Sequence, residues 1–411
     1  MTSGTTRHRA LRGLALFAAA GLLASACSST GVALTSSSPT TPAESSSTTV
    51  GPAPEVALAA SVTDGATVGV DTAVSVTATA GTLSKVALAS KGTFKENQGA
   101  VPGTLSQDRS TWTAGRFLDP ARTYTLTMTG ANADGIAKTS TLTFKTKTLG
   151  IGQQAVVYPV PGNGSTVGVA MPVIMQFDLP VKDKAAFEKR MVVTSVPAQR
   201  GSWRWISSKE VHWRPAGYWK PGTKVSLKAA LNGVPAGGGI YGMSDRSATF
   251  TVGRLFVMKA DLKKTHSLRV YAKGKLVRTI PVSGGRSSNQ SRSGNKVIMS
   301  KAYHVVMDAA TLNIPKNDPD YYRLDVYYAM RETWSGEFLH AAPWSVGSQG
   351  RTNVSHGCIG MSTSNARWLY ENVLVGDPVN VTGTSRHLEE GNGWTDWNTS
   401  YEQFKKGSAL A

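Results

Sequence analysis

The most informative stretch of this sequence is the run Ser355-His356-Gly357-Cys358, which His340 precedes with residues 341–354 in between. Cys358 is one of two cysteines among the 411 residues, and the other, Cys27, lies near the N-terminus. A thiolate rather than a thiol is the nucleophile in cysteine chemistry, and a neighbouring imidazole is the usual group that generates it near neutral pH. The pattern therefore predicts a nucleophilic Cys358 with His340 as its base.

The residues around this run extend the pattern. His340 is followed by Ala341-Ala342-Pro343-Trp344, and Cys358 is followed by Ile359-Gly360-Met361-Ser362. The arrangement resembles the signature of the L,D-transpeptidase (YkuD-type) catalytic domain, which has a histidine, a spacer of similar length and then Ser/Thr-His-Gly-Cys. The resemblance covers roughly residues 56–411 and extends to the actinobacterial lipoprotein members that carry two immunoglobulin-like modules ahead of the catalytic domain.

The resemblance implies acyl transfer between peptidoglycan stem peptides. Cys358 attacks the carbonyl after the third residue of a donor tetrapeptide, and the terminal D-alanine leaves. The side-chain amine of a second stem then resolves the thioester and gives a 3→3 cross-link, so that two steps through a covalent intermediate replace one difficult step. The resemblance also implies acylation by carbapenems and no cofactor.

The resemblance assigns roles to further residues. His340 takes the thiol proton and later passes a proton to the leaving amine. The backbone N–H groups of His356, Gly357 and Cys358 are the expected donors to the oxyanion. The position of Gly360 belongs to the substrate site, and the donor pocket maps onto five further residues: Met307, Tyr322, Ser335, Gly336 and Trp344.

The sequence departs from the family pattern at three positions. Gly360 stands where the family usually has asparagine, Ala341 where serine commonly follows the histidine, and Leu312 where the lid often has tyrosine. These changes remove an amide from the substrate site and leave His340 to be oriented by another group. They predict a divergent member that cross-links weakly or prefers a different acyl acceptor.

Two other functional hypotheses remain open. A peptidoglycan hydrolase or L,D-carboxypeptidase could use the same Cys358 and His340 site, with water resolving the thioester. Alternatively, the chain is a non-catalytic envelope lipoprotein whose β-sandwiches bind wall polymer. Spacing alone does not separate these hypotheses.

The N-terminus predicts export and a lipid anchor. Arg7, Arg9 and Arg12 precede an apolar run over residues 13–24, which is too short to span a bilayer comfortably. Small residues before Cys27 resemble a lipobox, so residues 1–27 are interpreted as a lipoprotein signal peptide and Cys27 as the lipidated residue. We expect the chain on the outer face of the cytoplasmic membrane, in the cell envelope. Ordinary cleavage near this point and a Cys27–Cys358 disulfide are less favoured alternatives.

Composition sets limits on the partners. The net charge is +18, but the charge is dispersed and no nucleic-acid-binding motif is visible, so an anionic cell envelope suits the charge better. The histidines are scattered without the spacing of metal ligands, and no metal site is expected. The expected partners are therefore peptidoglycan stem peptides and the membrane, and the oligomeric state stays open.

The N-terminal half of the chain predicts β-sandwiches. Residues 28–55 are mostly Ser, Thr, Pro, Ala and Gly and form a disordered tether. Short alternating strands with regular turn signals follow, and the segment 65–70 recurs at 164–169, an offset of 99 (164 minus 65). A period of about 100 residues corresponds to one immunoglobulin-like sandwich, so we expect two sandwiches, at 56–149 and 150–253.

The remainder is expected to be a mainly β catalytic domain at 254–382 with one or two helices, followed by a tail at 383–411 that packs on it. Residues 283–295 are predicted to form a mobile loop, and residues 309–328 a long irregular segment that serves as an active-site lid. A helix is expected over 363–374 and a closing strand over 377–381.

Overall fold

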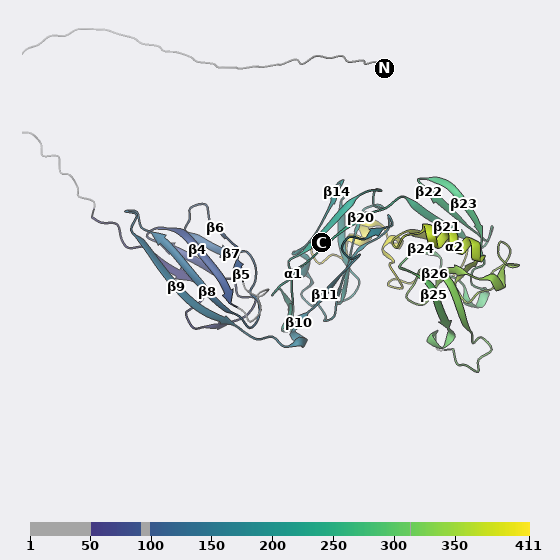
Figure 1. The fold of residues 1–411 in the computed structure, drawn as a ribbon, viewed down its shortest axis with the longest axis horizontal. Coiled ribbons are helices and arrows are strands. Elements are labelled where there is room, and N and C mark those ends of the chain that lie inside the picture. The colour runs from purple at the N-terminus through teal and green to yellow at the C-terminus, as the bar shows by residue number, and fades with distance from the viewer. Residues whose placement is uncertain (1–50, 92–98, 313) are drawn as a thin grey trace, which may run out of the picture. The chain divides into compact units, whose positions relative to one another are not determined.

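The computed structural model describes residues 51–91, 99–312 and 314–411 (Figure 1). The predicted signal peptide, its Cys27 and most of the predicted tether lie outside these residues. Among the helices in the described part of the chain, none has the length and apolarity needed to cross a membrane.

The first sandwich has one sheet of four strands and one of five. Its strands alternate, as in the strand Thr123–Ala131, where every second side chain is buried. The four-stranded sheet has the order β1 (Ala57–Ala60), β3 (Ser75–Thr79), β7 (Thr111–Ala114) and β6 (Gly103–Leu105). The other has the order β2 (Thr67–Val68), β9 (Ala137–Thr146), β8 (Thr123–Ala131), β4 (Thr82–Lys91) and β5 (Gly99–Val101).

The second sandwich has two four-stranded sheets, a small third sheet and the short helix α1 (Lys184–Glu188). The first sheet is β11 (Val157–Val160), β13 (Val173–Phe177), β16 (Glu210–Pro215) and β15 (Gly201–Trp205). The second is β12 (Thr166–Val167), β20 (Arg246–Val252), β17 (Lys224–Ala229) and β14 (Met191–Val196). The small sheet is β10 (Gln154–Ala155), β19 (Ile240–Gly242) and β18 (Pro235–Gly237).

The sequence repeat corresponds to equivalent elements in the two sandwiches. β2 and β12 carry the repeated segment, and each pairs in parallel with the last strand of its own sandwich. The repeated tryptophans, Trp112 and Trp213, are buried on β7 and β16. Each ring covers a glycine of the neighbouring strand, Gly103 or Gly201, where a Cβ atom would overlap the indole. The predicted fold class of two sandwiches before a β-rich domain is thereby confirmed.

The third part of the chain has two sheets and the helix α2 (Thr363–Asn372). The larger sheet is β23 (Lys275–Pro281), β22 (Ser267–Ala272), β21 (Phe256–Asp261), β29 (Pro378–Thr382) and β24 (Gly294–Val297). The smaller is β25 (Ser300–Asp308), β26 (Arg323–Arg331), β27 (Phe338–Ala341) and β28 (Ile359–Met361). One apolar core joins both sheets to α2, with Met258, Val270, Leu339, Ile359 and Leu369 among its fully buried members.

Two segments differ from expectation. The predicted mobile loop at 283–295 is anchored, because Ser283 pairs with Gly360, Gly285 pairs with Ser355, and β24 already begins at Gly294. The irregular segment ends at residue 322 rather than 328, because β26 begins at Arg323. The start of this strand was not predicted from the sequence, because polar residues and tyrosines stand between its apolar residues.

The tail contacts more than the catalytic domain. After a 3-10 turn at Asp396–Asn398 it forms the short helix α3 (Tyr401–Lys405). Trp397 Nε1 donates to the Ala170 carbonyl oxygen at 2.8 Å, and the Arg214 guanidinium lies over the Trp397 and Phe404 rings. The expectation that the tail packs on the catalytic domain leaves out its last part, which packs on the second sandwich.

Candidate active site

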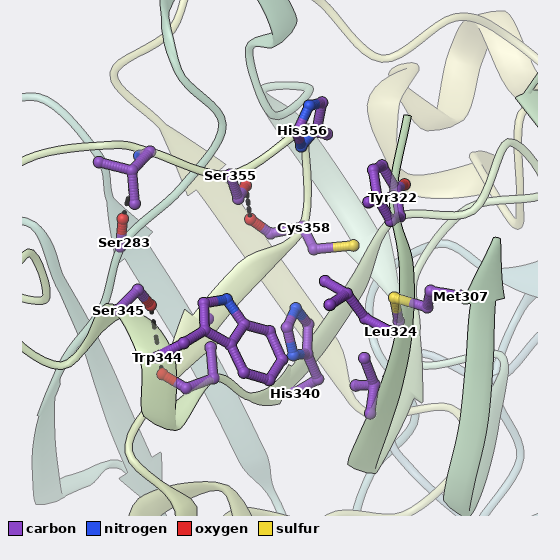
Figure 2. Close-up of a pocket in the computed structure, with 14 residues that line it drawn as sticks. Ser283, Met307, Tyr322, Leu324, His340, Trp344, Ser345, Ser355, His356 and Cys358 are labelled. Atoms are coloured by element: carbon purple, nitrogen blue, oxygen red, sulfur yellow. Dashed lines mark hydrogen bonds between the residues drawn. The ribbon is translucent and has the colours of Figure 1, made fainter. Parts of the chain in front are cut away.

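Two adjacent parallel strands bring His340 and Cys358 to the same face of the smaller sheet. β27 and β28 pair with His340 opposite Gly360, and Cys358 lies two residues before Gly360. Side chains two residues apart on a strand share a face, so the imidazole and the thiol lie on one side. Figure 2 shows both side chains at one cavity, with a ring nitrogen of His340 turned toward the cysteine.

The cavity has a volume of about 190 Å³ and is mainly apolar. It brings together eight residues that the sequence singled out: Met307, Tyr322, His340, Trp344, Ser355, His356, Cys358 and Gly360. Sequence reasoning missed Ser283, Leu324, Val326, Ala342, Ser345 and Val354. Leu324 and Val326 could have been found from their spacing, because residues two apart on a strand share a face. Together with Met307, they face the cavity from the hairpin of β25 and β26.

His340 is buried and held in one tautomer. Its Nδ1 lies 2.7 Å from the carbonyl oxygen of Ala341, so Nδ1–H donates and Nε2 is left as an acceptor. Burial lowers the pKa of His340 below its ordinary value, while this hydrogen bond acts in the opposite direction. The ring is therefore neutral at pH 7. The backbone carbonyl group of Ala341 orients the ring, because the side chain of Ala341 has no polar group that could do so.

The thiol of Cys358 is protonated in the resting site. Burial raises the pKa of Cys358 to about 12, and the nearby carboxylates of Glu337 and Glu332 act in the same direction. The thiol lies 3.6 Å from the carbonyl oxygen of Gly336 and donates to it. Attack by Cys358 therefore requires a base that removes the proton during the reaction.

The backbone before Cys358 is fixed by Ser355. The hydroxyl of Ser355 donates to the Cys358 carbonyl oxygen at 2.6 Å and accepts from the Gly357 N–H at 3.1 Å. The amide of Gly357 is thus already engaged by Ser355, whereas its expected role as an oxyanion donor stays a prediction. Gly357 has φ = +129°, a conformation that favours glycine.

His356 shapes the rim of the cavity. Arg286 Nη2 donates to His356 Nε2 at 3.1 Å, and Arg286 also pairs with Asp320 at 2.7 Å. Burial and the Arg286 charge lower the pKa of His356, so the ring is neutral. Its ring centroid lies 4.8 Å from that of Tyr322, which places this tyrosine directly against the Ser355–Cys358 run.

Ser335 and Gly336 lie outside the cavity lining, on the turn between β26 and β27. Gly336 has φ = +92° and contacts the site through its carbonyl oxygen. Asn392 of the tail holds this turn, because its Oδ1 accepts from Ser335 N–H at 2.9 Å and its Nδ2 donates to Ser335 Oγ at 3.0 Å.

A buried ionic cluster beneath this turn was not anticipated from the sequence. The Lys296 ammonium group forms ion pairs with the carboxylates of Glu337 at 2.6 Å and Glu332 at 3.2 Å. The Arg292 guanidinium forms an ion pair with Glu337 at 2.8 Å. Burial raises the pKa of Glu332. Arg292 also pairs with Glu389 of the tail, so the cluster links the tail to the backbone next to Cys358.

Gly360 of β28 lies close to Ala342, the residue that follows β27. A Cβ atom built there would lie 2.8 Å from the Cβ of Ala342, closer than two such atoms pack. Any side chain at residue 360 therefore requires Ala342 to move. The side chain of Leu312, the third departure, is not among the described parts of the structure.

Within the described ranges, no group of three or more His, Cys, Asp and Glu side chains could hold a metal ion. The site consists of a protonated thiol, a neutral imidazole with a free acceptor nitrogen and an apolar cavity beside both. This arrangement suits acyl transfer to sulfur, with the imidazole carrying the proton.

Comparison with known proteins gives two family matches and close relatives. Residues 256–381 match the L,D-transpeptidase catalytic domain, and residues 70–235 match a bacterial Ig domain. L,D-transpeptidase 2 of Mycobacterium tuberculosis (strain CDC 1551 / Oshkosh) is 40% identical over 356 residues, which cover 86% of this chain and 85% of the relative. L,D-transpeptidase 5 of Mycobacterium tuberculosis (strain ATCC 25618 / H37Rv) is 36% identical over 323 residues, 75% of this chain and 68% of the relative. A solved structure of LD transpeptidase LdtMt1 in complex with imipenem is 39% identical, covers 55% of this chain and 98% of that chain, and has a TM-score of 0.49.

Proposed function

Since the chain belongs to the L,D-transpeptidases of the YkuD family, we propose that it forms 3→3 cross-links between peptidoglycan stem peptides through a thioester on Cys358. The family is one of cysteine-dependent acyltransferases that act on these stems. The observation that carries the proposal is the pairing of a neutral His340, with Nε2 free to accept a proton, and the Cys358 thiol at one cavity.

In the first half-reaction the sulfur of Cys358 attacks the carbonyl carbon after the third residue of the donor. Because the pKa of the thiol is raised to about 12, its proton passes to His340 Nε2 as the S–C bond forms. The C–N bond then breaks, and the terminal D-alanine leaves with the proton from His340. The amides of His356 and Cys358 are the proposed donors to the developing oxyanion.

In the second half-reaction the side-chain amine of an acceptor stem attacks the thioester. A C–N bond forms, the C–S bond breaks, and the amine proton passes through His340 to the sulfur. If water replaces the amine, the same steps release a tripeptide. The apolar lining of the cavity, with Met307, Leu324 and Val326, disfavours water at the thioester.

A muropeptide assay with purified tetrapeptide stems tests this function. We expect dimers cross-linked between third residues, lost on substitution Cys358→Ala and retained on substitution of the other cysteine, Cys27→Ala. Tripeptides without dimers would indicate an L,D-carboxypeptidase. Wall binding that is unchanged in Cys358→Ala, with neither product formed by the wild type, would indicate a non-catalytic protein.

We also propose that carbapenems acylate Cys358. A β-lactam carbonyl presents the sulfur with an acyl donor whose leaving nitrogen stays attached, so one adduct per protein is the expected product. Intact mass spectrometry checks this, with Cys358→Ala as the unreactive control. No adduct at any carbapenem concentration would argue against an open nucleophilic site.

For localisation we propose a lipid anchor on Cys27 at the outer face of the cytoplasmic membrane, supported by the lipobox-like residues 23–27. Fractionation tests it: Cys27→Ala is expected to move the protein from the membrane to the soluble fraction of the envelope. Membrane retention of this variant would contradict the anchor.

A further inference from the structure

A second, polar groove lies behind the Ser355–Cys358 run. It comprises two adjoining cavities of about 770 Å³ and about 440 Å³, which share Ser287, Gln290 and Ser385 in their walls. Lys263, His266, Arg286 and Arg386 line it, and no aspartate or glutamate does. We call this feature the basic groove.

Two of its cations are not neutralised by the protein. In the described part of the chain Lys263 and Arg386 are exposed and form no ion pair, and the Arg386 guanidinium donates a hydrogen bond to the carbonyl oxygen of Gln290 at 3.4 Å. The third cation, Arg286, forms an ion pair with Asp320 of the segment that was predicted to be the lid. A concave site lined by cations with no carboxylate attracts an anionic ligand.

One layer of backbone separates the basic groove from the catalytic cavity. Ser283 faces the cavity, whereas Gly285 and Arg286 line the groove. The segment at 283–286 is bonded to the run itself, because Ser355 N–H donates to the Gly284 oxygen at 3.0 Å and Arg286 N–H donates to the Ser355 oxygen at 2.9 Å. A stem of four residues spans about 13 Å when extended, enough to pass over such a wall.

The proposed reaction needs a second peptide, the acceptor stem. The catalytic cavity has a volume of about 190 Å³ and offers little room for this peptide beside the donor. That acceptor carries one nucleophilic amine and several carboxylates, so its net charge is negative. The geometry points to the basic groove as the site that binds the carboxylates of the acceptor stem, while its amine reaches the thioester on Cys358. This inference rests on the proposed function.

The chemical step is aminolysis of the thioester. The acceptor nitrogen forms the new C–N bond, the C–S bond breaks, and the proton lost by the amine returns through His340 to the sulfur. The groove takes part in no bond change. Its role is to raise the local concentration of acceptor over water, which sets the ratio of cross-linked dimer to hydrolysed tripeptide.

The test separates the two half-reactions in the full chain. The variant Lys263→Glu/Arg386→Glu reverses two groove charges at residues that contact neither Cys358 nor His340 in the described structure. Its matched control, Arg269→Glu/Lys275→Glu, makes the same change in charge at exposed positions that line neither groove nor cavity. The acylation rate with the donor tetrapeptide and the dimer-to-tripeptide ratio at fixed acceptor concentration are measured for each.

We expect the groove variant to acylate within about twofold of wild type, while its dimer-to-tripeptide ratio falls about tenfold or more and recovers at high acceptor concentration. The control variant keeps both values. An unchanged ratio in the groove variant would overturn the inference, as would a parallel loss of acylation, which assigns the groove to the donor or to the fold. Failure of the wild type to form any acyl-enzyme would instead remove the proposed function itself.

Discussion

At the scale of single residues, the imidazole of His340 and the thiol of Cys358 are both uncharged in the resting site. His340 is neutral because burial lowers its pKa, and Cys358 is protonated because burial raises its pKa to about 12. The proton therefore moves only when an acyl group is present to be attacked. Such a site reacts with a bound acyl donor and stays inert toward solutes that require a free thiolate.

The first prediction concerns that inertness. In a Cys27→Ala protein, alkylation of Cys358 by iodoacetamide should accelerate about tenfold per pH unit from pH 7 to 10 without levelling off. Acylation by the donor should instead be nearly independent of pH above 7, because His340 is already neutral. Glutathione is the control thiol, since its alkylation levels off within this range. A plateau for Cys358 near neutral pH would show a preformed thiolate.

The second prediction concerns the close approach at Gly360. Substitution Gly360→Ala places a methyl group 2.8 Å from the Cβ of Ala342 and should destabilise the protein by about 1–3 kcal/mol. Adding Ala342→Gly should recover part of this loss, because it removes the opposing methyl group. The control is Gly347→Ala, whose Cβ meets nothing within 4 Å.

Denaturant midpoints of the wild type and the three variants measure these effects. Equal stability of Gly360→Ala and wild type would mean that residues 360 and 342 move apart at no cost. The absence of any recovery in the double variant would place the strain elsewhere.

The motif around Cys358 and the histidine spacing were sufficient to predict that Cys358 and His340 meet, but not the apolar wall of the cavity, because short motifs are local in sequence. The protonation state was not predictable. It depends first on the burial of the thiol and then on the charges of Glu337, Glu332 and Lys296, which lie near Cys358 only in the folded domain. Likewise, the engagement of the Gly357 amide depends on the rotamer of Ser355.

At the scale of elements, the turn between β26 and β27 connects the tail to the nucleophile. Gly336 of this turn accepts the thiol hydrogen bond, and Asn392 of the tail clamps the adjacent Ser335 through two hydrogen bonds. Alternation and turn signals predicted most strands. They did not predict this connection, since nothing local ties residue 392 to residue 335.

The third prediction tests this connection. Asn392→Ala should slow acylation of Cys358 by about tenfold, mainly in kcat, because the Gly336 carbonyl loses its fixed position. The matched control is Asn398→Ala, which removes the tail's hydrogen bonds to Asn295 of β24 but leaves the turn intact. This control should lose stability and keep its acylation rate. Equal acylation rates in both variants would show that the clamp has no role in positioning.

At the scale of the whole molecule, a buried histidine joins the tail to the second sandwich. His212 of β16 lies 2.9 Å from both Asp396 of the tail and Glu210. Burial alone lowers the pKa of His212, but the two carboxylates outweigh it and raise the pKa to about 9. A folded-state pKa above the ordinary value of 6.5 means that the contribution to stability is complete below pH 6.5 and is lost as the pH rises through about 9.

The fourth prediction follows from this sign. Hydrogen exchange of the tail amides should show an opening free energy that falls by about 2–4 kcal/mol between pH 6 and pH 10. The Asp396→Asn variant should show a smaller fall, because one of the carboxylates that raise the pKa is gone. A tail equally protected at pH 6 and pH 10 would contradict the role of His212.

The central claim is that Cys358 carries the acyl group, and intact mass spectrometry after rapid quenching tests it most directly. The account predicts that a donor tetrapeptide adds the mass of its acyl part, without the terminal alanine, to one peptide that contains Cys358. Products formed at the wild-type rate with no mass added to that peptide, or formed equally by Cys358→Ala, would contradict it.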